Sequence, residues 1–137
     1  MLSLIATQTQ SRRNMSNRTS KENTDLILAD GPEGQDKKFK EVIELAYLLQ
    51  NAKGKTYGMS CFKRGMTGVA HNIYRKTDRL DSFDPVIWEN PNLGHGESVL
   101  DTLMDTANYC FKAITGYMVT HPEEFKLIVT GKRSVFL

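Results

Sequence analysis

The chain has 137 residues, a length that predicts one domain. Its 18 basic and 16 acidic residues give a formal net charge of +2, and 39% of the residues are hydrophobic. This composition excludes a fibrous or fully disordered chain, and so small a charge does not by itself indicate nucleic-acid binding. No stretch approaches the ~20 apolar residues of a membrane span, and the first six residues lack the features of a signal peptide. We therefore expect a cytoplasmic protein with no membrane partner.

Residues 1–34 are expected to form a flexible N-terminal arm. The segment 7–25 is polar and has almost nothing to bury, which is typical of a flexible arm or of a strap over a partner subunit. The short apolar patch 26–29 is a candidate anchor for this arm. Glycine and proline in residues 30–34 predict a break in any regular element, so we expect a single helical domain over residues 35–137.

Three segments show the apolar periodicity of amphipathic helices. The first is predicted over about 36–53, and Gly54 is expected to end it. The second is predicted over 67–80. The third and longest is predicted over about 96–120, and the proline at position 122 is expected to stop it.

The remaining segments predict loops. Residues 54–66 are glycine-bearing and basic, and residues 81–95 carry two prolines and a glycine, which indicates a long irregular connection. In the tail we expect a turn at 122–125 and then a short extended piece at 127–129. The pattern predicts an all-α fold of three main helices with long loops. Because three helices make a thin core, we expect dimerisation to complete a bundle.

The third predicted helix carries a ladder of carboxylates. Glu97, Asp101 and Asp105 follow one another at four-residue steps and fall on one side of the helix. Like charges at this spacing repel, and a divalent cation such as Mg²⁺ is one remedy. The alternative is a solvated face near the helix N-terminus, where acidic residues favour the helix dipole. Glu41 and Glu44 on the first helix could bring further carboxylates to the same site, although such pairs are also common on exposed surfaces.

The second predicted helix is basic. His71, Arg75 and Arg79 recur at four-residue steps, and Lys76 lies partly round the side. Guanidinium groups suit phosphate oxygens, and glycines in the preceding loop let backbone N–H groups approach an anion. The alternative is a solvated basic face.

The two cysteines, Cys61 and Cys110, show neither a disulfide framework nor a metal-binding spacing. We expect both to be free thiols that serve as packing residues rather than as nucleophiles.

Four segments, taken in order, resemble a family of small helical proteins common in phages, the nucleotide-modification-associated domain proteins. Residues 55–58 resemble its K-x-x-D-Y-G element, and residues 63–69 resemble its R-G-x-x-G-V element. Residues 76–80 resemble its K-x-x-R-L element, and residues 97–109 resemble its E-S-x-x-D-T-L-x-D-L-A-N-Y element. The family is distantly similar to the MazG-like all-α nucleoside triphosphate pyrophosphohydrolases. The resemblance covers about residues 39–111.

The resemblance implies roles for particular residues. Mg²⁺ would be held by Glu44, Glu97, Asp101 and Asp105, with Glu44 and Asp101 as the candidate catalytic carboxylates. Substrate would be bound by basic residues that grip phosphates and by polar residues that contact base or sugar: Lys55, Arg64, Lys76 and Arg79, and Tyr57 and Asn108.

Three functions follow as hypotheses. The first is a Mg²⁺-dependent (deoxy)nucleoside triphosphate pyrophosphohydrolase of phage or bacterial nucleotide metabolism. The second is a non-catalytic nucleotide-binding or adaptor protein associated with nucleotide modification or with host-defence signalling, which Thr56 favours because it stands where the family has Asp. The third is a structural or nucleic-acid-associated phage protein that uses its basic arm, which the near-neutral charge does not favour. A nucleotide and a second copy of the chain are the expected partners.

Overall fold

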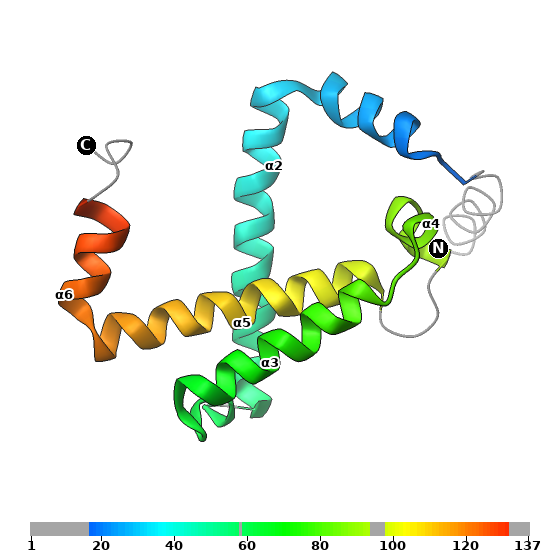
Figure 1. Cartoon of the computed structure of the whole chain (residues 1–137). Helices are drawn as coiled ribbons and strands as arrows, with labels where there is room; N and C mark the ends of the chain where they lie inside the picture. The colour runs from blue at the N-terminus through cyan, green and yellow to red at the C-terminus, as the bar shows by residue number, and fades with distance from the viewer. Residues whose placement is uncertain (1–16, 58, 94–97, 132–137) are drawn as a thin grey trace, which may run out of the picture.

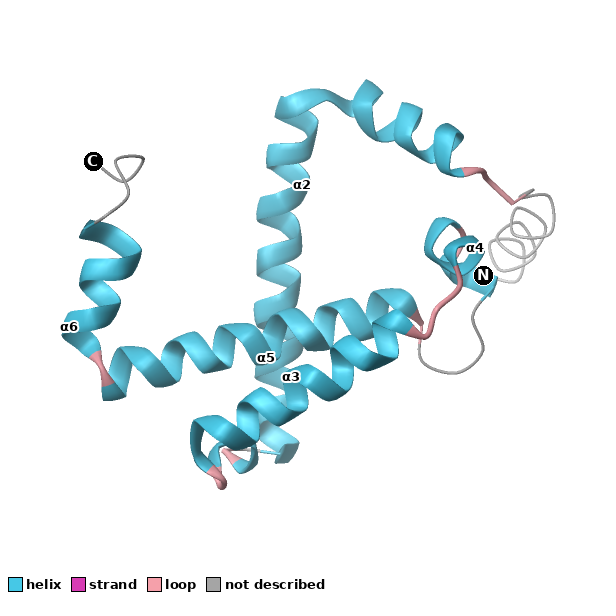
Figure 2. Cartoon of the chain, viewed as in Figure 1, coloured by secondary structure: helices cyan, strands magenta, loops and turns pink. Residues whose placement is uncertain are grey.

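The computed structural model describes residues 17–57, 59–93 and 98–131. Throughout these ranges the regular structure is helical and no strand occurs, so the prediction of an all-α fold is confirmed (Figure 2). Five α-helices lie in the described ranges, together with short helical turns at Ser60–Phe62 and Pro91–Leu93: α2 (Ser20–Tyr57), α3 (Gly65–Asp81), α4 (Pro85–Glu89), α5 (Val99–Thr120) and α6 (Pro122–Phe125). The predicted count of three helices is therefore not confirmed, although each predicted helix overlaps one of the three long helices, α2, α3 and α5. The additional two, α4 and α6, are single turns that begin at prolines, a residue whose fixed φ suits the first helical position.

Helix α2 consists of two segments that meet at a sharp kink (Figure 1). Gly31 has φ 75° and ψ 172°, a conformation that only glycine adopts readily, and Pro32 follows it inside the helix. The break expected at residues 30–34 is therefore a kink between two helical segments. The segment before the kink, residues 20–30, lies within the predicted arm, whose first sixteen residues are outside the described part of the chain.

The segment of α2 before the kink is attached to the end of α4. The Arg18 backbone N–H donates to Asn90 Oδ1 at 2.7 Å. Asn23 Nδ2 donates to both the backbone oxygen and the carboxylate of Glu89, at 2.8 and 2.7 Å. The described N-terminal residues therefore fold back along the molecule and contact a segment about seventy residues later.

Helices α3 and α5 lie side by side and form the best-packed part of the protein (Figure 1). Val69 on α3 and Thr102 on α5 are completely buried, and Val99 is 3% exposed. Gly116 allows close approach, since a Cβ there would lie 2.8 Å from Met66 Sδ. Helix α2 also contacts α5, and Ala46 is its buried residue.

The ends of two helices differ from the sequence prediction. Helix α2 continues past Gly54 to Tyr57, because glycine weakens a helix without necessarily ending it. The tail predicted as extended at 127–129 is instead a π-helical turn, η3 (Lys126–Gly131). Lys126 keeps right-handed helical angles at the end of α6, so the helical path continues.

The stop at the end of α5 is as predicted, because the helix ends at Thr120 immediately before His121 and Pro122. Its start is Val99, after Ser98 as N-cap. Among the described helices, none combines the length and the apolar character needed to cross a membrane.

Candidate functional site

Asp105 on α5 joins the three long helices. Lys53 Nζ on α2 donates to its Oδ1 at 2.5 Å, and Lys76 Nζ on α3 donates to its Oδ2 at 3.1 Å. The side chains of Asp105 and Lys76 are 17% and 16% exposed, whereas that of Lys53 is 42% exposed. One carboxylate is therefore shared between two ammonium groups, one enclosed and one open to solvent.

The charge state of Asp105 follows from these contacts. Partial burial raises the pKa of its carboxyl, but the hydrogen bonds from Lys53 and Lys76 lower it by more, so the pKa lies below the ordinary value of 3.8. The carboxylate is ionised at neutral pH. With two lysines on one carboxylate, this cluster has a net charge of +1.

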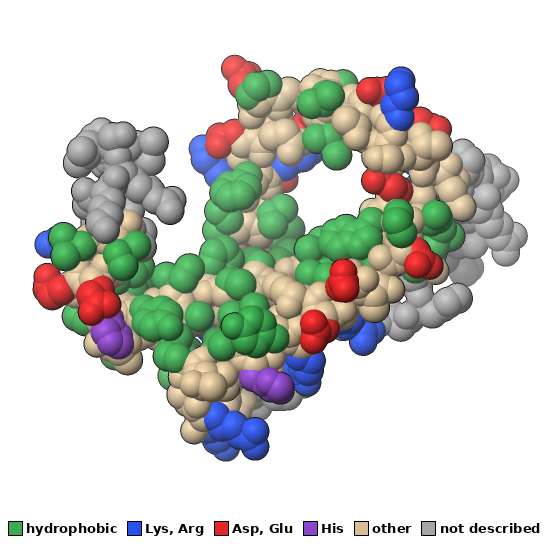
Figure 3. Space-filling model, in the orientation of Figure 1, with side chains coloured by type: hydrophobic (Ala, Val, Ile, Leu, Met, Phe, Trp, Pro, Cys, Tyr) green, Lys and Arg blue, Asp and Glu red, His purple; other side chains and the backbone are tan. Residues whose placement is uncertain are grey.

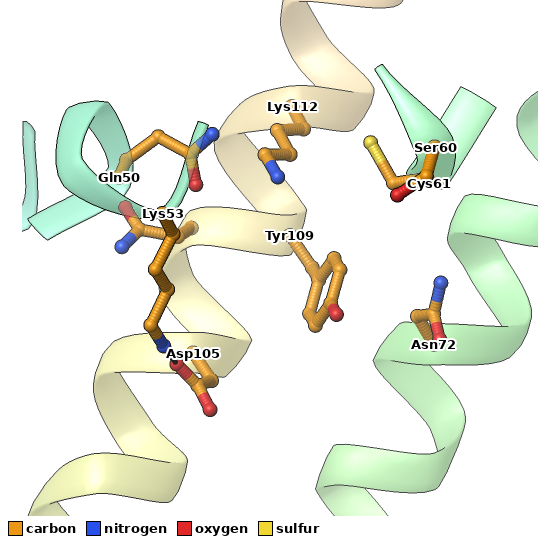
Figure 4. Close-up of a pocket in the computed structure, with 9 residues that line it drawn as sticks. Gln50, Lys53, Ser60, Cys61, Asn72, Asp105, Tyr109 and Lys112 are labelled. Carbon is orange, nitrogen blue, oxygen red and sulfur yellow. Dashed lines mark hydrogen bonds and ion pairs between the residues drawn. The ribbon is translucent and has the colours of Figure 1, made fainter. Parts of the chain in front are cut away.

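A cavity of about 410 Å³ opens beside Asp105, between α2, α3 and α5 (Figure 4). In Figure 4, Lys53 extends from α2 toward Asp105, and the Tyr109 ring lies between α5 and Asn72 of α3. The lining is rich in amide, hydroxyl and ammonium groups: Gln50, Lys53, Ser60, Cys61, Asn72, Asp105, Asn108, Tyr109 and Lys112. Its volume falls within the range of small-molecule pockets.

Two residues on α5 give the pocket further binding capacity. The ammonium of Lys112 lies 5.6 Å from the centre of the Tyr109 ring, a cation–π distance. Asn108 is 7% exposed, and its Nδ2 has no hydrogen-bond partner within the described part of the chain. A buried amide without a partner costs free energy, and a ligand that accepted its hydrogen bond would recover that cost.

These groups together suit a polar anion. Lys53, Lys76 and Lys112 bring three positive charges against the single negative charge of Asp105. Ammonium groups bind phosphate as point charges, and amide side chains offer the paired donors and acceptors that base edges require.

The described acidic residues predicted to share one side of α5 make different contacts in the structure. Asp101 is exposed and belongs to a capping box, because its backbone N–H donates to Ser98 Oγ at 3.1 Å and its carboxylate accepts from Ser98. Asp105 pairs with lysines. Glu97 lies outside the described residues, and Glu44 is exposed on α2.

No group of three or more His, Cys, Asp or Glu side chains within the described ranges is arranged to hold a metal ion. The compensation that the ladder requires is present at Asp105, where two ammonium groups supply it.

Of the predicted substrate-binding residues, the structure brings two to the pocket region. Asn108 lines the pocket, and Lys76 contacts Asp105 at its edge. Lys55, Arg64 and Arg79 are exposed, and the side chain of Tyr57 is outside the described part of the chain. The acidic and basic helices therefore meet, and Lys76 provides one contact between them, with Asp105.

On the exposed basic side of α3, Arg75 contacts a residue that lines the pocket. Arg75 Nη2 donates to Asn72 Oδ1 at 3.3 Å, whereas His71 is exposed. Cys61 and Cys110 are both free cysteines, as expected, and Cys61 lines the pocket.

Sequence reasoning did not select three residues that shape the site, Lys53, Asn72 and Lys112. For Lys112 a signal was present, because it lies seven residues after Asp105 and so falls on the same side of α5. Lys53 stands in the last turns of α2, where a lysine is also favourable to the helix dipole, so its position alone did not mark it.

Comparison with known proteins gives no assignment. No protein-family model matches the chain, and neither a curated protein nor a solved structure matches it.

Proposed function

We propose that this protein binds a nucleotide in the pocket between α2, α3 and α5. The observation that carries the proposal is the pairing of Lys53 and Lys76 with the single carboxylate of Asp105, in a pocket that Lys112 also lines. The amide of Asn108, which has no partner within the described residues, lies in the same pocket. Phosphate groups would lie against the lysines, and the amide would contact base or sugar. The resemblance to nucleotide-modification-associated proteins supports the same class of ligand.

The pairing of Lys53 and Lys76 with Asp105 favours binding, because it holds both ammonium groups at the pocket in the absence of a ligand. Lys53 and Lys76 are held by one carboxylate, so their side chains are already ordered at the pocket. A site that is ordered in advance loses less conformational entropy on binding.

The described carboxylates do not by themselves form a Mg²⁺ site. Asp105 accepts hydrogen bonds from two ammonium groups, and Asp101 is engaged at the helix cap. We therefore place nucleotide binding first, without a metal ion held by the protein.

A Mg²⁺-dependent pyrophosphohydrolase is the second candidate. One observation favours it: Asp101 and Asp105 lie one turn apart on α5, so the first lies near the pocket edge that the second occupies. Mg²⁺ commonly binds through one or two carboxylates together with substrate phosphates.

One set of measurements tests both candidates. Thermal shift with a panel of ribo- and deoxynucleotides, with Mg²⁺ and with chelator, measures binding, and release of pyrophosphate measures hydrolysis. Stabilisation that needs no metal, without turnover, supports the binding function. Turnover abolished by Asp101→Ala, with the fold retained, would establish the hydrolase. The absence of both stabilisation and turnover across the panel would exclude both candidates.

A further inference from the structure

Helix α5 carries an apolar stripe that the described elements leave largely open to solvent. Its members follow one another at spacings of three and four residues over five turns and share one side of the helix: Leu100, Leu103, Ala107, Phe111, Ile114 and Met118. The five large side chains are 39–64% exposed. Figure 3 shows hydrophobic side chains gathered along α5 on the face toward the viewer.

The other sides of α5 are already occupied. Thr102 and Val99 are buried where α3 packs, and Asp105 and Asn108 line the pocket between α2 and α3. The stripe is therefore a separate third side. Its spacing is that of a helix that packs against another helix.

The stripe has a symmetry that fits one particular occupant. Counted from Ala107, apolar residues stand four positions away on each side, Leu103 and Phe111, and seven positions away on each side, Leu100 and Ile114. An antiparallel copy of the same helix crossing at Ala107 would place Leu103 against Phe111 and Leu100 against Ile114. The small residue at the crossing would let the two helices approach closely. A two-fold contact requires this kind of self-complementary surface.

The small core favours a partner that is always present. Within the described residues the buried hydrophobic side chains are Ala46, Val69 and Val99, whereas whole stripes of large ones are exposed. A chain of this length normally buries most of its apolar surface, so a second molecule that covered a stripe would gain much burial. A second copy is available in equal amount wherever the chain folds.

We propose that a second copy of this chain covers the α5 stripe, with the two α5 helices antiparallel and crossing at Ala107. The stripe continues at Phe111 into an apolar groove of about 500 Å³ lined by Ile43, Tyr47 and Met59. This groove shares Asn108 and other residues with the polar pocket, so the dimer contact would border the nucleotide site. The proposal does not depend on nucleotide binding.

Molar mass in solution tests the interface. Light scattering on the full chain should give twice the 15.5 kDa mass of one chain. Ile114→Glu should lower the measured molar mass to that of one chain, while the helical circular dichroism signal is retained. The matched control is Val119→Glu, a change on the same helix at a residue that is 82% exposed and off the stripe, and it should leave the mass doubled. A wild-type mass of one chain would overturn the proposal.

A cross-link decides the matter even if Ile114→Glu does not fold. With Cys61 and Cys110 changed to serine, Ala107→Cys should form an intermolecular disulfide on mild oxidation, because the crossing brings position 107 of each copy together. Thr77→Cys, on the exposed side of α3, should not cross-link. A doubled mass without the Ala107→Cys cross-link would also overturn the proposal, since the copies would then meet elsewhere.

Discussion

At the scale of single residues, Asp105 contributes both to stability and to the site. Asp105→Asn would leave Lys53 and Lys76 close together without the negative charge between them. We expect a loss of about 1–3 kcal/mol in the free energy of unfolding, since charge-assisted hydrogen bonds are lost in a partly buried place. Urea unfolding at neutral pH measures this, with the exposed Asp78→Asn on α3 as control. An unchanged unfolding midpoint for Asp105→Asn would contradict the prediction that the ion pairs of Asp105 stabilise the protein.

The same residue predicts a dependence of stability on pH. The pKa of Asp105 in the folded state lies below its ordinary value of 3.8, so the unfolded chain binds the proton more readily. Its stabilising contribution is therefore complete above that ordinary value and is lost as the pH falls through the folded-state pKa. The difference in stability between wild type and Asp105→Asn should shrink on acidification. Asp30, whose pKa the Lys38 hydrogen bond also lowers, is common to both proteins and cancels in the difference. A difference that stays constant or grows in acid would contradict the prediction.

Which residues meet at the site could be predicted only in part. Asp105, Lys76 and Asn108 were selected from spacing along helices and from the family resemblance. The contact between Lys53 and Asp105 joins residues 52 positions apart, and no periodicity within one helix carries that information. The arginines of α3 suit phosphate, but residue type alone does not determine which basic side chain of a helix lies beside the pocket.

At the scale of elements, the start of α5 depends on the capping box at Ser98. Ser98→Ala removes the acceptor for the Asp101 backbone N–H and should cost about 1 kcal/mol of stability. Thr115→Ala, an exposed change within the same helix, is the control and should alter stability by less than about 0.5 kcal/mol. Denaturant unfolding of both variants measures the difference. Equal effects of the two substitutions would show that the cap contributes nothing.

The kink in α2 predicts opposite effects for two glycines of the same helix. Gly31→Ala places a Cβ on a backbone with φ 75° and ψ 172° and should destabilise the protein by about 1–3 kcal/mol. Gly54→Ala lies in helical backbone where an added Cβ meets nothing, and should stabilise by about 0.5–1 kcal/mol. Thermal unfolding of the pair measures both. A stabilising Gly31→Ala would mean that α2 does not require the kink.

The elements themselves were more predictable than their ends. Apolar periodicity identified all three long helices, because that pattern reflects burial of one face. The predicted helix end at Gly54 and the predicted extended piece at 127–129 were wrong, because the continuation of a helix at these places depends on small differences in local free energy. Apolar periodicity also left residues 20–30 without a helix, since their helical segment is attached through the polar contacts of Asn23 and of Arg18 rather than through a buried stripe.

At the scale of the whole molecule, the described part of α2 and α5 exposes many large apolar side chains, whereas few hydrophobic side chains are buried in the core. Because we expect dimerisation to stabilise the folded chain, the midpoint temperature of unfolding should rise with protein concentration. Calorimetry over a hundredfold range of concentration should show an upward shift of several degrees for the wild type. The same shift should be absent from Ile114→Glu. A midpoint that does not move with concentration in the wild type would indicate a self-sufficient monomer.

We propose that lysines at the junction of three helices bind nucleotide phosphates. Calorimetric titration of a nucleoside triphosphate against wild type and against Lys112→Met tests it most directly, because Lys112 lines the pocket without taking part in the Asp105 pairs. Lys63→Met is the matched control for the loss of one positive charge, because Lys63 is exposed in the short segment before α3. We predict that Lys112→Met weakens binding about tenfold or more, a loss of ~1.4 kcal/mol, while Lys63→Met leaves the affinity nearly unchanged. Equal affinities for wild type and Lys112→Met, or no heat of binding to the wild type, would contradict the account.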